Sequence, residues 1–507
     1  MKVSRSVLGI SMVIAVVFIL WGIVLPKNMS SITSQIQQFI QHKFGWFYLL
    51  AASAFLVFSI FLVFSKYGNI RLGKDDEKPE YSFITWFAML FSAGMGIGLV
   101  FWGVAEPLSH FASPPVGEGG TTGAAREALK DTLFHWGLHP WAIYTLIGLS
   151  LAYFKFRKNA PGLISATFYP ILGEKVKGPI GKTIDILAVF ATLFGVATSL
   201  GFGAAQISGG LSSLIPNIPN NFTTQLIIIA IVTILFISSA LSGLDKGIKY
   251  LSNGNIALAV LLMLVLLFIG PTEFIANSFT TMLGDYIQRL PAMSLQMSPF
   301  TESQQAQWTQ AWTIFYWAWW ISWAPFVGTF IARVSRGRTV REFILGVLLV
   351  PTIFSAIWFA IMGGSGIYQE IFSKAGIVNV INKQGTEIAL FKFLEAFPLG
   401  SILSVLAILL IATFFITSAD SATFVLGMQV THGSLNPSKT IRVIWGLILS
   451  VSAAVLLGTG GLQGLQTASI ISAFPFALVL ILMMVSLVKA LNKEKIVKIV
   501  SKPSRAN

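Results

Sequence analysis

Five tryptophans crowd one uncharged stretch of fifteen residues, which also holds a tyrosine and two phenylalanines and reads Trp312-Thr-Ile-Phe-Tyr-Trp-Ala-Trp-Trp-Ile-Ser-Trp-Ala-Pro-Phe326. At 100° per residue, a helix here carries one continuous aromatic stripe, flanked by Trp320 and made of Trp312, Tyr316, Trp319 and Trp323. The faces of such rings attract cations, above all a cation that cannot donate hydrogen bonds. A girdle of tryptophans at a membrane–water interface is the alternative interpretation.

A second aromatic cluster lies in another apolar stretch and consists of Trp136, Trp141 and Tyr144. The same segment holds His135 and His139, which have the spacing of metal ligands on a helix. No third ligand accompanies this pair and Pro140 disturbs the turn, so we expect no metal site there. The chain has no cysteine, which excludes disulfides, thiolate metal sites and cysteine nucleophiles.

Glycine occupies every second position of one apolar stretch, Gly94-Met-Gly-Ile-Gly98. Each glycine inside a helix costs up to about 1 kcal/mol, so we expect local unwinding. An unwound helix in a membrane offers free carbonyls to cations and free amides to carboxylates. A packing face of small residues between helices is the alternative.

Two hydroxyl side chains, Thr417 and Ser418, end a later apolar run. Facing unwound backbone, they would form a hard oxygen site that suits a small cation. None of the 20 acidic residues lies at the centre of a predicted span. We therefore expect no buried carboxylate relay for protons.

The elements that carry these residues are membrane spans. The 507 residues have a mean hydropathy of +0.77, and only 11% are charged, against about a quarter in soluble domains. Apolar runs long enough to cross a bilayer recur along the chain. We predict an all-α polytopic membrane protein with twelve transmembrane helices, near residues 6–26, 46–65, 82–106, 131–155, 182–207, 225–242, 252–272, 309–332, 342–364, 399–419, 440–458 and 465–488. Two segments between spans, 273–290 and 387–397, have the pattern of amphipathic helices.

The net charge of +14 reflects topology. With the N-terminus inside, most lysines and arginines fall in the inner loops and tails, as the positive-inside rule requires. We therefore expect both termini in the cytoplasm and contact with anionic lipid, and no binding of nucleic acid. A catalytic acid/base pair, a nucleophile–histidine pair and a metal cluster are all lacking from the sequence pattern, which argues against an enzyme. A channel is disfavoured because a tight aromatic cage traps an ion.

These motifs together resemble the betaine–choline–carnitine transporter family, over essentially all twelve spans. The tryptophan stretch and the following Arg333-Val-Ser-Arg-Gly-Arg-Thr-Val-Arg341 are its most specific features. The resemblance implies a bacterial plasma-membrane protein that forms trimers. It also implies two N-terminal helices followed by a five-plus-five inverted repeat of the leucine-transporter type. The corresponding segments are 1–81 for the two helices, 82–290 and 291–488 for the repeats, and 489–507 for a short basic tail.

By this resemblance, an aromatic box for a trimethylammonium group consists of Trp136, Trp141, Tyr144 and Trp320. Trp319 and Trp323 would line the path below it, and backbone amides of Gly94, Gly96 and Gly98 would meet a substrate carboxylate. A sodium site would use Ala93, Met95, Phe414, Thr417 and Ser418. A second sodium site would involve Thr192 and Phe326, but its other hydroxyl position holds Val196, which offers no oxygen.

The resemblance therefore implies sodium-coupled uptake of a zwitterion, most simply glycine betaine, for osmoprotection, with sodium as the coupling ion and no other cofactor. Proton-coupled choline members of the family carry an acidic residue where this chain has Gly98. A choline transporter, coupled to sodium or protons, is the alternative. Because the basic tail is short, we predict that deleting it from Lys493 onward changes osmotic activation only modestly.

Overall fold

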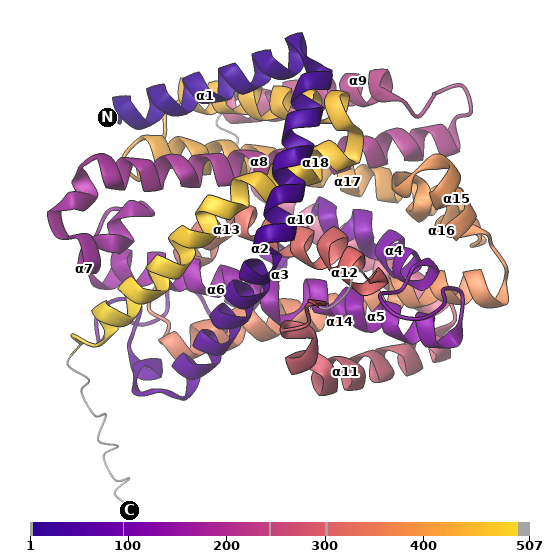
Figure 1. Ribbon diagram of the computed structural model, residues 1–507, viewed down its shortest axis with the longest axis horizontal. Helices are drawn as coiled ribbons and strands as arrows, with labels where there is room; N and C mark the ends of the chain where they lie inside the picture. The colour runs from indigo at the N-terminus through magenta and orange to yellow at the C-terminus, as the bar shows by residue number, and fades with distance from the viewer. Residues whose placement is uncertain (1–3, 95, 243–244, 300–302, 435, 495–507) are drawn as a thin grey trace, which may run out of the picture.

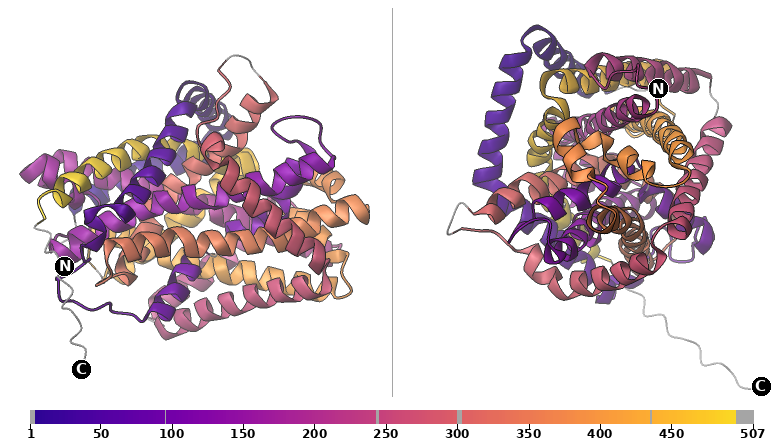
Figure 2. Two further views of the ribbon diagram at one scale, coloured as in Figure 1. Left: turned by 90° about the horizontal axis from the view of Figure 1, so that it is seen from below. Right: turned by 90° about the vertical axis from the view of Figure 1, so that its right-hand side faces the viewer.

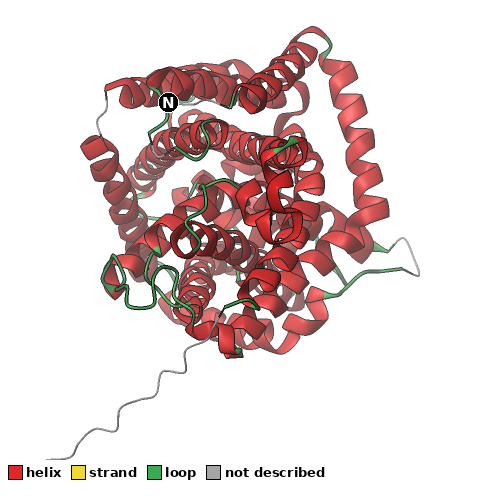
Figure 3. Ribbon diagram, turned by 90° about the vertical axis from the view of Figure 1, so that its left-hand side faces the viewer, coloured by secondary structure: helices red, strands yellow, loops and turns green. Residues whose placement is uncertain are grey.

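A computed structural model describes residues 4–94, 96–242, 245–299, 303–434 and 436–494. Helices joined by loops make up this described part of the chain, in which no strand occurs (Figure 3). Eight of its helices are long and apolar enough to cross a membrane. The prediction of an all-helical membrane protein is thereby confirmed.

The helices follow in an order close to that of the predicted spans. The first half of the chain contains α1 Arg5–Val24, α2 Pro26–Phe64, α3 Phe83–Gly94, α4 Ile97–Ala112, α5 Thr122–Trp136, α6 Leu138–Ala152, α7 Tyr169–Leu172, α8 Pro179–Leu214, α9 Phe222–Ser242 and α10 Asp245–Ile269. The second half contains α11 Thr272–Ser294, α12 Gln304–Trp308, α13 Phe315–Val334, α14 Val340–Phe372, α15 Ile377–Gln384, α16 Ala389–Glu395, α17 Gly400–Val430 and α18 Lys439–Leu491.

Most long helices run in roughly the same direction, with α8 packed against both α17 and α18 at the centre (Figure 1 and Figure 2). Helix α2 crosses this bundle steeply. It begins at Pro26, twenty residues before the predicted span at residue 46, so that boundary was wrong. Proline favours the first position of a helix, and the polar segment after it simply continues the same helix.

Three interruptions divide the helices near the site. Helix α3 ends at Gly94 and α4 starts at Ile97, which confirms the predicted unwinding. Helices α5 and α6 meet at Gly137, whose ψ of −130° is not helical. Gly461, with φ 57° and ψ −144°, breaks α18 between the two spans predicted there. Positive φ favours glycine because the side chains of other residues clash in that region.

The two predicted amphipathic segments are helical. Helix α11 packs along α5 and α14, and α16 packs against α17 and α4. Both helices carry charged residues, Glu273 in the first turn of α11 and Lys392 in the last turn of α16, and neither is long and apolar enough to be a candidate span.

Candidate functional site

The two predicted aromatic clusters meet where α13 packs against the junction of α5 and α6. The ring centroids of Trp136 and Trp320 lie 4.8 Å apart with the rings edge to face, and those of Tyr144 and Trp320 lie 6.3 Å apart. Trp319 stacks on Trp320 at 4.8 Å. Trp141 contacts Tyr144, with centroids 5.3 Å apart. Two parts of the chain almost 200 positions apart therefore form one aromatic cluster, called the enclosure below. It consists of Trp136, Trp141, Tyr144, Trp319 and Trp320.

Backbone breaks place these rings. The turn at Gly137 puts Trp136 at the end of α5 and starts α6 in a new direction, so Trp136, Trp141 and Tyr144 do not follow the geometry of one helix. Gly98, just after the unwound segment, lies against the enclosure. A Cβ atom there would lie 2.5 Å from Cη2 of Trp319 and 3.3 Å from Cη2 of Trp136.

The enclosure is buried and keeps polar atoms without partners. Trp136, Trp141, Tyr144 and Trp320 are each at most 7% exposed. The Tyr144 hydroxyl and the Trp319 Nε1 are buried without a hydrogen-bond partner in the described part of the chain. Buried donors without partners are rare because each costs about 1–3 kcal/mol. An aromatic enclosure with free donors can hold an organic cation that also carries an anionic group.

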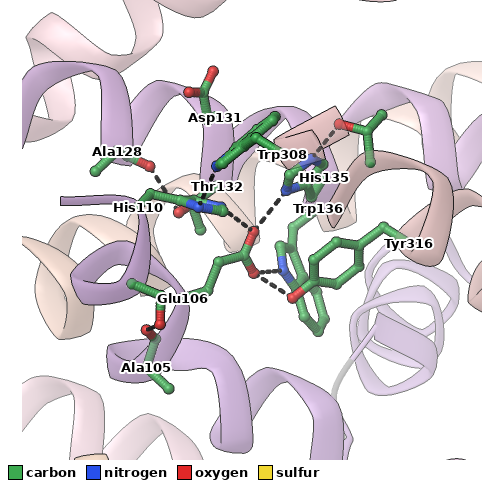
Figure 4. Close-up of polar contacts among 12 residues, drawn as sticks. Ala105, Glu106, His110, Ala128, Asp131, Thr132, His135, Trp136, Trp308 and Tyr316 are labelled. Carbon is green, nitrogen blue, oxygen red and sulfur yellow. Dashed lines mark hydrogen bonds and ion pairs between the residues drawn. The ribbon is translucent and has the colours of Figure 1, made fainter. Parts of the chain in front are cut away.

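A buried carboxylate lies directly behind this enclosure. It corrects the prediction that no acidic residue lies inside a span. Glu106 is fully buried in α4 (Figure 4). One of its oxygens accepts a hydrogen bond of 2.7 Å from Trp136 Nε1 and another from the Tyr316 hydroxyl. Its other oxygen lies 2.7 Å from His135 Nδ1 and 3.2 Å from His110 Nε2. The predicted span ended at residue 106, but α4 continues to Ala112, so Glu106 lies well inside the helix.

The two histidines that the sequence paired lie apart. His135 joins Glu106, whereas His139 stacks on Trp317 and hydrogen-bonds Ser294. Glu106, His110 and His135 do have metal-ligand atoms within 4.8 Å of one another. However, Trp308 Nε1 donates to His110 Nδ1, so the proton of neutral His110 sits on Nε2 and points at Glu106. That nitrogen has no lone pair left for a metal, and a hydrogen-bond network fits the group better.

A cavity of about 1010 Å³ lies between α13 and α17. Trp323 and Phe326 of α13 line it, together with Phe414, Thr417 and Ser418 of α17. Five basic residues also line it, together with the acidic Glu80 and Asp420: Lys155, Arg333, Arg336, Lys439 and Arg442. Of the residues predicted for the path and the sodium site, Trp323, Phe414, Thr417 and Ser418 thus line one cavity, whereas Trp319 does not line it.

Thr417 has a neighbour that sequence reasoning missed. Asn255 of α10 is 2% exposed, and its Nδ2 donates to Thr417 Oγ1 at 3.1 Å. The Asn255 Oδ1 is buried without a partner in the described structure. Asn255 belongs to the polar start of the predicted span 252–272, Ser252-Asn-Gly-Asn255, so its local sequence offers no clear signal. Ala93 and Gly94 end α3, and Met95 of the predicted sodium site lies outside the described residues.

The predicted second sodium site has a different environment. The Thr192 hydroxyl donates to the Ala188 carbonyl at 2.8 Å and accepts from Gln429 Nε2 at 3.2 Å. Val196 is fully buried. Ser199, one turn from Val196, keeps a buried hydroxyl without a partner within the described residues.

Comparison with known proteins agrees with this arrangement. The family model described as "BCCT, betaine/carnitine/choline family transporter" matches residues 6–496. The chain is 56% identical to the glycine betaine transporter OpuD of Bacillus subtilis, over 98% of this chain and 96% of that protein. It is 48% identical to a probable glycine betaine transporter of Desulfitobacterium hafniense, over 97% and 98% of the two chains. It is 45% identical to an ectoine/hydroxyectoine transporter of Virgibacillus pantothenticus, over 97% of each.

These proteins are transporters and not enzymes, and the match extends along nearly the whole chain and includes both aromatic clusters. The chain therefore belongs to the betaine/carnitine/choline family of membrane transporters.

Proposed function

We propose that the protein takes up glycine betaine together with sodium by alternating access. The observation that carries this proposal is the buried enclosure of Trp136, Tyr144 and Trp320. A quaternary ammonium has diffuse charge and an apolar methyl surface, so it needs no hydrogen bonds from its host. Each aromatic face contributes roughly 1–2 kcal/mol to its binding in a dry site. The names of two relatives support the choice of substrate.

The carboxylate of the substrate would meet backbone amides near Gly96 and Gly98. Gly98 abuts Trp319 and Trp136, so the unwound backbone lies beside the enclosure. The same contact leaves no room for the acidic side chain that proton-coupled choline members carry at this position. A zwitterionic substrate therefore suits the site better than choline.

Sodium would bind where α17 faces the unwound segment, through Thr417 and Ser418 beside Phe414. Ala93 and Met95 would add backbone carbonyls. In this state Thr417 Oγ1 accepts one hydrogen bond from Asn255 Nδ2, which leaves its second lone pair for an ion. Thr192 would belong to a second site only if its present partners release it, and one sodium suffices for our proposal.

One sodium ion supplies enough energy for osmotic loading. A sodium ion entering with a neutral zwitterion gains ~2.3 kcal/mol per 100 mV. With about 150 mV and a tenfold sodium gradient, the total is roughly 5 kcal/mol. This energy can concentrate the substrate inside by a factor between about 10³ and 10⁴.

For the architecture, we propose twelve spans, in which α3–α4 and α5–α6 are one interrupted span each and α18 is two. Segment 1–81 would precede the inverted repeats 82–290 and 291–488. The basic residues that line the large cavity support placing it at the cytoplasmic side, so this state would be open to the inside. The Ser4 amide donates to the Val430 carbonyl, and Glu494 pairs with Arg157, which supports placing both termini on that side. Assembly as a trimer and contact of the 489–507 tail with anionic lipid complete the proposal.

Uptake of labelled glycine betaine into proteoliposomes tests this function. We expect accumulation that requires an inward sodium gradient. Counterflow with choline and ectoine then ranks the substrates. Sodium-independent uptake would refute the coupling, and exchange of choline in preference to glycine betaine would refute the substrate.

A further inference from the structure

Glu106 is the buried acidic group that the proposed transport cycle leaves without a role. Its side chain is fully buried, and four polar groups surround its two oxygens (Figure 4). None of the salt bridges formed by the described residues joins Glu106 to a lysine or arginine. A charge this deep in the protein needs compensation.

The hydrogen-bond donors around this carboxyl group favour one of its protonation states. Indole nitrogen can only donate, so Trp136 provides a fixed donor to one oxygen. Trp308 forces the His110 proton onto Nε2, which provides a fixed donor to the other oxygen. The Tyr316 hydroxyl is a third donor, and His135 Nδ1, 2.7 Å from Glu106, donates or accepts according to its tautomer. These donors favour the ionised carboxylate, whereas burial by itself favours the neutral acid.

The Trp136 ring, which is part of the enclosure, contacts this carboxylate directly. The Trp136 indole holds Glu106 through its nitrogen and packs 4.8 Å from Trp320 through its ring. Tyr316 also bonds Glu106, and its ring lies 5.6 Å from that of Trp136 and 5.8 Å from that of Trp320. A carboxylate that accepts from an indole N–H or a phenol O–H raises the electron density of the ring, which strengthens its attraction for a cation.

We propose that Glu106 is the fixed counter-charge for the quaternary ammonium group of the substrate. It acts through Trp136 and Tyr316 and does not touch the substrate, so it is a positioning residue. This inference rests on the proposed function, because it requires a substrate with a permanent positive charge. The sequence pattern predicted a neutral cage, whereas the structure places a carboxyl group without a lysine or arginine partner behind one wall of the enclosure.

A carbon isostere separates the charge effect from a structural effect. Glycine betaine and 3,3-dimethylbutanoate have the same shape, but the second has a neutral carbon in place of the nitrogen. Two charges about 10 Å apart at an effective dielectric near 20 change an affinity roughly tenfold. We expect Glu106→Gln to weaken glycine betaine binding by about this factor and not to weaken binding of 3,3-dimethylbutanoate, whose only charge is a carboxylate that an anion at Glu106 repels. Affinities for both are measured by tryptophan fluorescence on the purified full chain.

Two further variants control this experiment. Glu106→Asp keeps the charge, so its affinity for glycine betaine should lie nearer the parent value than that of Glu106→Gln. Asp185→Asn neutralises another buried carboxylate, which accepts hydrogen bonds from Ser165 in a different region, and it should bind glycine betaine as the parent does.

Several outcomes overturn the proposal. If Glu106→Gln weakens both ligands equally, Glu106 only supports the structure of the enclosure. Unchanged betaine affinity in Glu106→Gln excludes the counter-charge while leaving the proposed function intact. If the isostere binds too weakly to measure, the proposal fails when Glu106→Asp binds betaine no better than Glu106→Gln. A parent protein that does not bind glycine betaine refutes the proposed function itself.

Discussion

Trp320 is the residue on which the aromatic enclosure depends most directly. It packs against Trp136, stacks on Trp319, and its Nε1 donates to the His135 carbonyl at 2.9 Å. We expect Trp320→Leu to raise the half-saturation for glycine betaine at least tenfold, because one aromatic face is worth ~1–2 kcal/mol. Uptake kinetics in proteoliposomes measure this change. Trp46→Leu, at a half-exposed position of α2, is the matched control and should leave affinity unchanged. Parent-like affinity in Trp320→Leu would remove this residue from the site.

Gly96, between α3 and α4, and Gly98, in the first turn of α4, differ in the space around them. A Cβ atom at Gly98 meets Trp319 at 2.5 Å, whereas one at Gly96 meets nothing within 4 Å. Gly96 has an extended backbone that any residue adopts. Trp319 cannot yield easily, because it stacks on both Phe315 and Trp320. We therefore expect Gly98→Ala to lower betaine affinity at least tenfold and Gly96→Ala to change it less than threefold, as measured by ligand titration. Equal effects of the two substitutions would contradict the close packing at Gly98.

At the scale of elements, α17 presents the hydroxyls proposed to bind sodium to the large cavity. We expect Thr417→Ala combined with Ser418→Ala to abolish the stimulation of uptake by sodium, because sodium needs oxygen ligands to replace its water. Uptake measured across a sodium series tests this. Thr413→Ala, one turn earlier on the same helix, removes a hydroxyl that bonds only its own helix and should keep the sodium response. Sodium dependence that survives the double change would place the ion elsewhere.

At the scale of the whole molecule, Glu494 joins the end of α18 to distant loops. It pairs with Arg157 at 2.8 Å and with Lys158, and it accepts from the Tyr153 hydroxyl at 2.7 Å. Arg157 in turn contacts Asp75.

Burial would raise the pKa of Glu494, but these partners outweigh it and hold the pKa at about 2. Because the pKa is depressed, the stabilisation is complete above the unfolded value near 4.3 and is lost as the pH falls through about 2. After allowance for solvent screening, it amounts to about 1–2 kcal/mol.

A spin label can follow this connection, since the chain contains no cysteine. With Lys493→Cys carrying the label, we expect low mobility at pH 6 and rising mobility as the pH falls from about 4 towards 2. The same label with Glu494→Gln should be mobile already at pH 6. A signal that does not respond to pH in the first variant would show that Glu494 does not hold the end of α18.

The ion pairs of Glu494 also bear on the tail prediction. Deleting residues from Lys493 onward removes Glu494 together with the basic tail. A truncation from Lys495 keeps Glu494 and isolates the tail itself. The expectation of a modest effect on osmotic activation applies to this shorter truncation.

The sequence by itself determined those features that depend on local pattern. Long apolar runs fix the membrane class, alternating glycines predict the break between α3 and α4, and helical spacing places Trp312, Tyr316, Trp319 and Trp323 on one stripe. These properties follow from the helical period, from intrinsic backbone preferences and from the cost of placing charge in a bilayer. The starting residue of α2 was missed because a polar helix continues without a local stop signal.

Only the tertiary structure decided the surroundings of Glu106 and Thr417. Glu106 lies 30 residues from Trp136 and 210 from Tyr316, and Asn255 lies 162 residues from Thr417. No local pattern encodes such pairings, because they depend on how breaks at Gly137 and at Gly96 direct the following helices. A glutamate in an apolar helix is costly when alone and is tolerated when donors from other helices surround it. The packing of those helices therefore decides whether Glu106 is buried as an anion and where its charge acts.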